Sequence, residues 1–186
     1  MTKMKALSVG ELSTCCYIVW DDSADTCVVI DPGAEPERIR TACEGRRIEA
    51  ILLTHGHFDH IGGVEELARD GAEIVIHQAD APLLGDAQLN VSWLAGRNTT
   101  APAATHTVCE GDTLTFAGVT FSVLHTPGHT PGSVCYQAGG LLFTGDTLFH
   151  GGYGRTDLPG GSMRQLISSL HRLRTEAQQY EIYPGH

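Results

Sequence analysis

The chain has few basic residues. Lys and Arg number 12 against 22 Asp and Glu, which gives a net charge of −10 over 186 residues. This balance disfavours a nucleic-acid partner, because binding a polyanion needs Lys and Arg to displace counterions. No run of 18 apolar residues exists, so no segment predicts a membrane span or favours a membrane partner. The segment 1–9 has neither a long apolar stretch nor a cleavage site, so we expect a cytoplasmic protein.

Paired-cysteine motifs are also missing. The six cysteines are spread along the chain, and none forms a CxxC pair. Four of them fall in apolar, strand-like runs, namely Cys15, Cys16, Cys27 and Cys135. We therefore expect free, buried, reduced thiols and neither a cysteine metal site nor a cysteine nucleophile.

The chain shows no internal repeat, low-complexity tract or charged linker, and its length suits one domain over residues 1–186. Apolar runs bounded by turn residues predict strands at 5–9, 15–20, 26–30, 50–53, 74–77, 113–116, 119–124, 133–137, 141–144 and 181–183. Helical spacing predicts helices at 37–44 and 64–69, and a third that is capped by Ser162. The third helix should carry on one face Met163, Leu166, Ile167, Leu170 and Leu173. Residues 85–104 predict a long loop, with or without a short helix.

The clearest chemistry follows a short apolar strand. Residues 54–60 read Thr-His-Gly-His-Phe-Asp-His, which places three imidazoles and one carboxylate within six residues. His55 and His57, two residues apart, can turn to one metal ion, and Asp59 and His60 can turn to another. Imidazole and carboxylate ligands suit zinc, and also iron or manganese.

Three further candidate ligands each follow a predicted strand. His129 stands between Pro and Gly residues in the segment 126–133, which fix a tight turn. Asp146 follows the strand 141–144, and His186 closes the sequence Tyr-Pro-Gly-His. Alone, each would be an ordinary turn or surface residue. Four ligand-bearing loops, each leaving a strand end, together predict a metal centre.

This pattern, His-x-His-x-Asp-His followed in order by His129, Asp146 and His186, resembles the metallo-β-lactamase superfamily over the whole chain. It is most similar to the short single-domain members of the glyoxalase II-like branch. The segments that carry this closer likeness are 30–33 (Ile-Asp-Pro-Gly), 126–133 and 154–157 (Gly-Arg-Thr-Asp). The resemblance implies an α/β fold, a four-layer αββα sandwich with the metal ions at one edge between the sheets.

The resemblance also implies roles for the ligands. One ion would be held by His55, His57 and His129, the second by Asp59, His60 and His186, and both by Asp146. The implied cofactors are two divalent ions, zinc first, with a bridging hydroxide as nucleophile. Two ions about 4 Å apart lower the pKa of a shared water and polarise a carbonyl, so no side-chain nucleophile is needed. Asp59 would orient the water, which makes Asp59 and Asp146 the candidate catalytic residues.

Other positions carry less specific signals. Asp31 is either the carboxylate partner of a ligand histidine or a turn residue before Pro32. Full-length glyoxalase II enzymes have an added helical region that binds glutathione carboxylates, and this chain ends before such a region. Because the sequence stops on a candidate ligand, we expect that a C-terminal tail is missing. Arg155 replaces a Lys of those enzymes and either pairs with a substrate carboxylate or forms a salt bridge with Asp157. His150 is a weaker candidate for contact with substrate.

The predicted function is therefore hydrolysis of a small-molecule substrate, an acyl thioester or related ester, in a pocket walled by 85–104 and 149–161. The main alternative is a mononuclear iron persulfide dioxygenase of the same fold, which shares the segment 154–157 and uses only the ligands His55, His57, His129 and Asp146. A β-lactamase is disfavoured because the bridging position holds Asp rather than Cys and no signal peptide is visible. The net charge disfavours a nuclease, and a module that only binds would leave seven suitable ligands idle.

Overall fold

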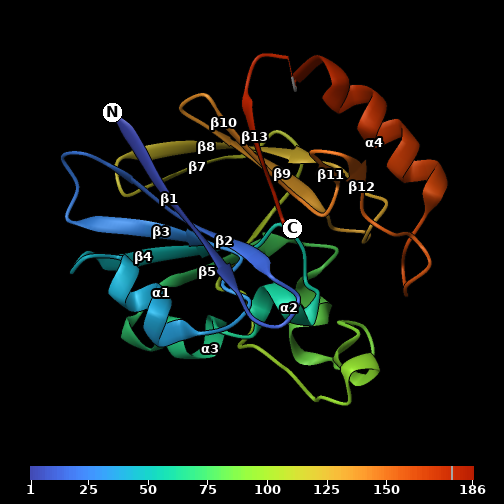
Figure 1. Ribbon diagram of the computed structural model, residues 1–186, viewed down its shortest axis with the longest axis horizontal. Coiled ribbons are helices and arrows are strands. Elements are labelled where there is room, and N and C mark those ends of the chain that lie inside the picture. The colour runs from blue at the N-terminus through green and yellow to red at the C-terminus, as the bar shows by residue number, and fades with distance from the viewer. Residues whose placement is uncertain (177) are drawn as a thin grey trace.

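A computed structural model describes residues 1–176 and 178–186 and shows two β-sheets packed face to face (Figure 1). The first sheet has six strands in the order β1-β2-β3-β4-β5-β6. Neighbours from β1 to β3 pair antiparallel, and those from β3 to β6 pair parallel. The strands are β1 (Thr2–Val9), β2 (Thr14–Asp21), β3 (Thr26–Ile30), β4 (Arg47–Leu52), β5 (Glu73–His77) and β6 (His106–Val108).

The second sheet has five strands in the order β13-β10-β9-β8-β7. They are β7 (Thr113–Phe116), β8 (Val119–His125), β9 (Val134–Ala138), β10 (Leu141–Gly145) and β13 (Glu181–Pro184). β13 pairs parallel with β10, while the other pairs are antiparallel. A small hairpin of β11 (Leu148–Phe149) and β12 (Gly152–Tyr153) follows β10. Strand β13 therefore brings the C-terminal residues beside the loop that leaves β10.

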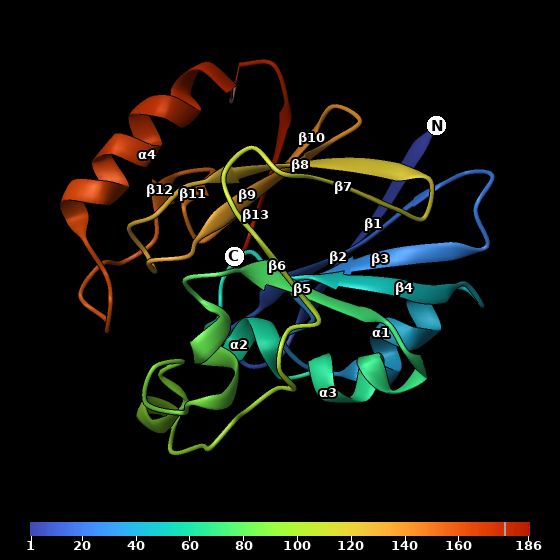
Figure 2. The same cartoon turned by 180° about the vertical axis from the view of Figure 1, so that it is seen from behind.

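Helices cover the outer face of each sheet (Figures 1 and 2). On the first sheet lie α1 (Pro36–Ala42), α2 (Phe58–Ile61) and α3 (Val64–Leu67), and on the second lies α4 (Met163–Glu176). Parallel strands need a crossover connection, which places these helices outside the first sheet. The αββα sandwich predicted from the sequence is confirmed.

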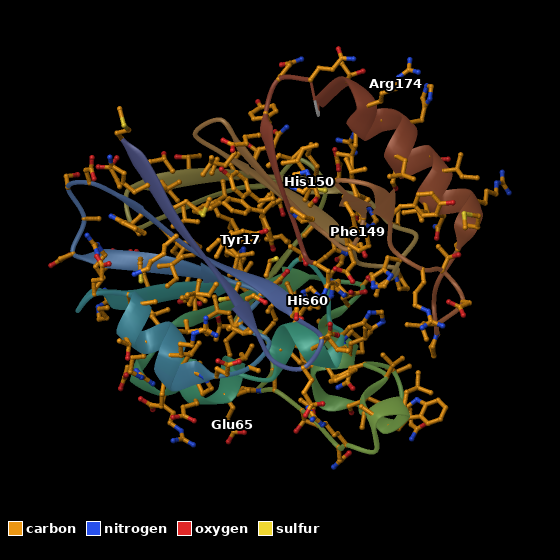
Figure 3. All side chains as sticks on the ribbon, in the orientation of Figure 1. Tyr17, His60, Glu65, Phe149, His150 and Arg174 are labelled. Atoms are coloured by element: carbon orange, nitrogen blue, oxygen red, sulfur yellow. The ribbon has the colours of Figure 1, made fainter. Side chains whose placement is uncertain are left out.

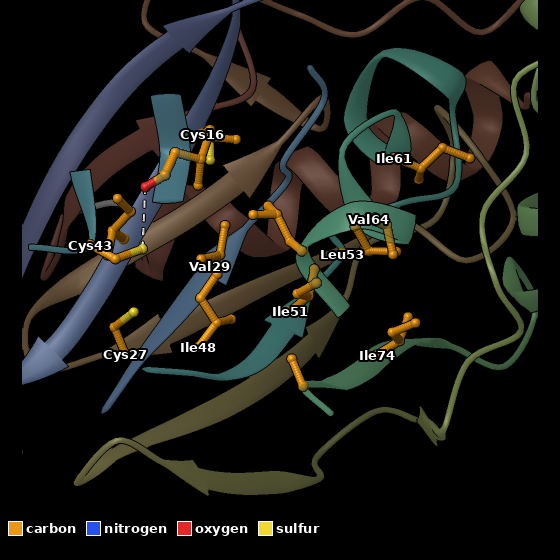
Figure 4. Close-up of a cluster of buried hydrophobic side chains, with 14 of the residues drawn as sticks. Cys16, Cys27, Val29, Cys43, Ile48, Ile51, Leu53, Ile61, Val64 and Ile74 are labelled. Carbon is orange, nitrogen blue, oxygen red and sulfur yellow. Dashed lines mark hydrogen bonds between the residues drawn. The ribbon is translucent and has the colours of Figure 1, made fainter. Parts of the chain in front are cut away.

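Three buried clusters fill the spaces between the four layers. Between the sheets, Tyr17, Phe121 and Phe143 are almost or fully buried, and Figure 3 shows Tyr17 in this layer. Between the first sheet and its helices, strand residues such as Val29 and Ile51 share one buried cluster with the helix residue Val64 (Figure 4). Successive residues of β3 belong to different clusters, which explains its continuous apolar run: both faces of this sheet are covered. The smallest cluster lies beneath α4.

All ten predicted strands are present, with bounds shifted by at most three residues. The helix predicted at 37–44 begins one residue earlier, because Pro36 suits a first helical position, and ends at Ala42. The helix predicted at 64–69 changes to a 3₁₀ turn after Leu67. Residues 85–104 form a loop around the short 3₁₀ segment Ser92–Ala95. Five short elements were not predicted: α2, the 3₁₀ segment Ala81–Gly85, β6, β11 and β12.

The predicted apolar face of α4 is partly wrong. The side chains buried against the second sheet are Leu166, Ser169 and Leu173, whereas Met163 is 44% and Ile167 60% exposed. The sheet contacts a narrower stripe of the helix than the apolar spacing suggested. Ser169 lies within that stripe, where its hydroxyl donates to the carbonyl of Pro127 at 2.7 Å. The Ser162 cap is present, with its Oγ 3.4 Å from the amide of Gln165. All six cysteines are free, as predicted, but the expectation that all are buried is wrong for Cys15 and Cys109, which are partly exposed.

Candidate metal centre

The seven candidate ligands meet at one edge between the two sheets. Strands β8, β10 and β13 run in one direction, so the loops that leave their carboxyl ends lie together. The loop that leaves β4 reaches the same edge from the first sheet, and Figure 3 shows His60 between the layers there. The sequence separates these ligands by as many as 131 residues (55 to 186), and the strand order brings them into contact.

The first cluster consists of His55, His57 and His129, all buried. Nδ1 of His57 lies 2.9 Å from Nε2 of His129, and the ring of His55 stands edge-on to both, with centroids 4.9 and 4.8 Å away. Three imidazoles without an intervening carboxylate do not stabilise one another, so their convergence indicates a common ligand.

The second cluster consists of Asp59, His60 and His186. Nε2 of His186 lies 3.3 Å from Nε2 of His60 and 3.2 Å from Oδ2 of Asp59, and the last two atoms are 3.5 Å apart. Ligand atoms bound at about 2.0–2.1 Å to a tetrahedral zinc lie about 3.3 Å from one another. The three atoms are therefore spaced like one face of such a coordination shell.

Asp146 lies between the clusters. Its Oδ2 is 3.5 Å from Nε2 of His129 and 3.5 Å from Nε2 of His186, and its Oδ1 is 3.4 Å from Nε2 of His60. One carboxylate thus faces ligands of both groups. This is the placement that a bridging ligand requires.

Hydrogen bonds outside the clusters fix the ring orientations. Nδ1 of His60 donates to Oδ2 of Asp31 at 3.0 Å, and Nδ1 of His129 donates to the carbonyl of Arg155 at 2.7 Å. The hydroxyl of Thr54 donates to Asp31 at 2.6 Å, so its oxygen is left to accept from Nδ1 of His55 at 3.1 Å. Such bonds leave the Nε2 lone pairs directed into the centre, as in metal sites whose histidines have carboxylate or carbonyl partners.

His186 is held by the backbone around it. The amide of Gly185 donates to the carbonyl of Gly145 at 2.8 Å, and its carbonyl accepts from the amide of Cys15 at 2.7 Å. Nδ1 of His186 donates to the carbonyl of Leu12 at 3.0 Å. A Cβ at position 185 would lie 2.1 Å from Oδ1 of Asp146, so only glycine lets the chain pass this close. The final residue is thereby placed against the second cluster.

Buried polar atoms without partners test whether metal ions fit this site. Among the described residues, Nε2 of His55 and Oδ1 of Asp146 are buried and make no hydrogen bond, and neither does Nε2 of His57. Buried polar atoms in native proteins are nearly always satisfied, so such atoms need an explanation. The first two point into the centre, where divalent ions would satisfy them. The donor set of imidazole and carboxylate suits zinc, iron or manganese.

The two clusters differ in charge. Burial and the neighbouring imidazoles lower the pKa of His57 to about 3 and that of His55 well below its usual value. Burial also acts to lower the pKa of His60, but the carboxylates of Asp59, Asp146 and Asp31 outweigh it and raise the pKa to about 9. In the same way Asp146 and Asp59 raise the pKa of His186 to about 11. Without metal, His55 and His57 of the first cluster are therefore neutral at pH 7, whereas His60 and His186 of the second hold protons between carboxylates.

Asp80 connects the ligand loops, and the sequence did not single it out. It is fully buried, and its Oδ2 accepts from the amide of Gly56 at 3.0 Å and the hydroxyl of Thr130 at 2.7 Å. Its Oδ1 accepts from the amide of Gly132 at 2.6 Å. The loop of His55 and His57 is thus joined to the loop of His129 through one carboxylate. The signal available in the sequence, a lone Asp after a strand, is too common to reveal this role.

A cavity of about 340 Å³ opens beside the clusters. Residues of 91–95 and 155–158 wall it, as predicted for the two loops. Arg155 lines this cavity, and its Nε and terminal nitrogen each lie 2.7 Å from an oxygen of Asp157. His150 is exposed and is not among the lining residues. Away from the centre, the rings of His77 and His125 stack at 4.0 Å.

A comparison with protein families explains this arrangement. The model of the metallo-β-lactamase superfamily matches residues 9–186. The chain belongs to the metallo-β-lactamase superfamily. A probable metallo-hydrolase of Bacillus subtilis (strain 168), YqgX, is 38% identical over 192 residues, which cover 99% of this chain and 90% of that protein.

Solved structures of the metallo-β-lactamase superfamily superpose closely on this chain. The B3 metallo-β-lactamase BLEG-1 is 38% identical with a TM-score of 0.90, covering 99% of this chain and 91% of that one. TTHA1623, in a di-iron-bound form, is 36% identical with a TM-score of 0.86, covering 98% and 91%. Membership of this metallo-hydrolase superfamily and the His and Asp clusters together indicate an enzyme with a divalent metal site. No helix among the described residues is long and apolar enough to cross a membrane.

Metal uptake should release protons unequally from the two clusters of this superfamily member. Since the pKa values of His60 and His186 are raised to about 9 and about 11, both hold protons at pH 7 that a metal ion must displace. The low pKa of His57 means that it has no such proton to lose. The metal affinity of the second cluster should therefore fall more steeply than that of the first as the pH decreases below 9. Calorimetric titration of metal-free protein in buffers of different protonation enthalpy measures this, and equal proton release for both equivalents would contradict it.

Proposed function

We propose that this protein is a binuclear metal-dependent hydrolase of the glyoxalase II-like type that cleaves a small acyl thioester. The observation that carries the proposal is the position of Asp146, whose two oxygens face ligands of both clusters at 3.4–3.5 Å. A mononuclear centre would need only the first cluster and Asp146. Here a second, carboxylate-rich cluster is built beside it and fixed by Asp31 and the C-terminal backbone.

Each side chain has a place in this scheme. His55, His57 and His129 would hold one ion, Asp59, His60 and His186 the other, and Asp146 both. When bound, two divalent ions, zinc first, supply an activated water and polarise the scissile carbonyl. His60 and His186 hold the pKa of Asp59 below its usual range against the effect of burial, so its carboxylate stays ionised. Asp59 also lines the cavity, where it can accept a hydrogen bond and orient the attacking water.

Metal analysis combined with a substrate panel tests the proposal. Protein reconstituted with zinc, iron or manganese should contain two ions per chain and hydrolyse acyl thioesters, and a chelator should remove the activity. Because BLEG-1 is a metallo-β-lactamase, a chromogenic β-lactam should be included, with lactones as further esters. One ion per chain in replete protein, or hydrolysis of β-lactams without thioesters, would contradict the proposal.

An iron-dependent persulfide dioxygenase is the second candidate. Its support is the segment 154–157, where the carbonyl of Arg155 holds Nδ1 of His129, and the iron found in the related TTHA1623. Such an enzyme would use only His55, His57, His129 and Asp146. Oxygen consumption with a glutathione persulfide, at one iron per chain and without thioester hydrolysis, would favour it.

The role of Arg155 can be tested separately. Its bidentate pair with Asp157 neutralises the guanidinium charge and occupies its Nε and one terminal nitrogen, so Arg155→Ala should leave KM unchanged for both carboxylate-bearing and neutral thioesters. Asp157→Asn, the matched variant, should free the guanidinium and lower KM for carboxylate-bearing substrates only. A higher KM confined to such substrates in Arg155→Ala would instead show that Arg155 recognises them.

A further inference from the structure

Outside the two clusters, the walls of the 340 Å³ cavity are mostly hydrocarbon. The ligands of the clusters form one side, and apolar side chains from four separate segments form the others. These apolar residues are Leu12, Phe58, Val91, Leu94, Ala95 and Leu158. A pocket of this kind binds the apolar part of a ligand, and its few polar groups fix the reacting end.

The guanidinium groups nearest the cavity are already paired. Arg155 lines it and is held by both oxygens of Asp157. Arg97 lines the adjoining cavity of about 310 Å³ and lies 2.9 Å from Glu11. Because the acidic partners neutralise both charges, neither arginine offers an uncompensated cation to the carboxylates of a glutathione moiety.

The segment that carries Val91 and Leu94 is fixed to the metal-binding loop. Asn90 is fully buried, and its amide nitrogen donates to the carbonyls of Leu83 at 3.1 Å and Thr99 at 2.8 Å. Its backbone carbonyl accepts from the amide of Phe58 at 3.0 Å. These bonds set the distance between the apolar wall and the clusters before any substrate arrives.

Two features of this wall indicate that it binds a ligand: the backbone conformation of Val91 and the exposure of two leucines. Val91 adopts a left-handed conformation with φ 61°, which is rare for a β-branched residue and tends to occur at ligand-binding positions. Its side chain is 4% exposed and lines the cavity. Near it, Leu94 is 54% and Leu12 53% exposed. A bound hydrocarbon chain would cover these leucines.

We infer that this cavity binds the uncharged hydrocarbon chain of the acyl group, so that the enzyme prefers medium-chain acyl thioesters of a neutral thiol to glutathione thioesters. This inference rests on the proposed thioester hydrolysis and adds the class of substrate. Leu94 and Val91 contact the chain, while the carbonyl carbon lies toward Asp146.

A series of straight-chain acyl thioesters of N-acetylcysteamine, from acetyl to octanoyl, tests the inference with the metal-replete enzyme. Each added methylene that enters the cavity should raise kcat/KM by about twofold to fourfold until the cavity is full. The same acyl groups on glutathione should give a lower kcat/KM, and an equal or higher value would contradict the preference for a neutral thiol. A flat dependence on chain length with measurable hydrolysis would overturn the inference and leave the proposed function intact.

Variants of the exposed wall sharpen the test. Leu94→Ser should reduce the gain in kcat/KM per methylene, because the substitution removes apolar surface of the cavity that the chain would contact. Ile167→Ser on α4 is the matched control, since Ile167 is similarly exposed, at 60% against 54% for Leu94, but does not line the cavity. An equal effect of both substitutions would show that the chain-length dependence does not arise at this wall.

Calorimetry with S-alkyl thioethers of N-acetylcysteamine gives a readout that does not depend on turnover. Affinity should rise with alkyl length in the wild-type protein and less in Leu94→Ser. If no thioester is hydrolysed but this trend is present, the proposed function fails and the hydrocarbon-binding cavity stands. Affinity independent of alkyl length would overturn the inference whatever the activity.

Discussion

Substitution of Asp146 by alanine is expected to remove metal from both clusters at once. The carboxylate faces His129 in the first cluster and His60 and His186 in the second, so its loss takes a ligand from each and lets two cations repel without an anion between them. We expect kcat/KM to fall on the order of a thousandfold or more, because both water activation and oxyanion stabilisation depend on the centre. Metal content after dialysis and kcat/KM on the best thioester measure these effects.

His60→Ala provides the contrast. It removes one ligand of the second cluster and the partner of Asp31, while the three histidines of the first cluster stay in place. The variant should retain about one ion per chain, against fewer for Asp146→Ala. Asp86→Asn, an exposed loop carboxylate, controls for the loss of a negative charge. Equal loss of both ions in Asp146→Ala and His60→Ala would contradict the assignment of Asp146 as the shared ligand.

The positions of the ligand residues could be predicted because their chemistry is visible in the sequence. Three histidines and an aspartate after an apolar strand leave few other uses, and strand ends place the remaining ligands at one edge of the sheets. Asp31 had two predicted roles, and the structure shows both: its φ of 50° makes the turn before Pro32, and its carboxylate accepts from His60 and Thr54. Whether the seven ligands bind metal stays a prediction.

Residues whose role depends on tertiary contacts could not be predicted. Asn90 lies in a segment without periodicity, and its importance appears only when Leu83, Thr99 and Phe58 surround it. The orientation of α4 was missed for a related reason. Apolar spacing shows which side chains are available for burial, but the way the helix packs on the second sheet decides that Leu166 is buried and Ile167 is not.

Substitution of Asp80 is expected to cause the second large effect. Asp80→Ala leaves the amides of Gly56 and Gly132 and the hydroxyl of Thr130 without their acceptor in a fully buried position. Each unsatisfied buried donor costs about 1–3 kcal/mol, so the free energy of unfolding should decrease by about 3 kcal/mol or more. Denaturant unfolding of the metal-free protein measures this loss.

Asp80→Asn separates a positioning role from a purely structural one. Asparagine keeps one acceptor oxygen but turns an NH₂ group toward a donor, so it should fold while shifting one ligand loop relative to the other. We expect the affinity of the first cluster, which contains His57 and His129, to fall about tenfold to a hundredfold, and the second to change less. The comparison is made below the unfolding transition of the variant. One result would show that Asp80 stabilises the fold without positioning the ligands: a lower melting temperature of Asp80→Asn with unchanged metal affinity at both clusters. The loops of His57 and His129 would then keep their spacing without the Asp80 carboxylate.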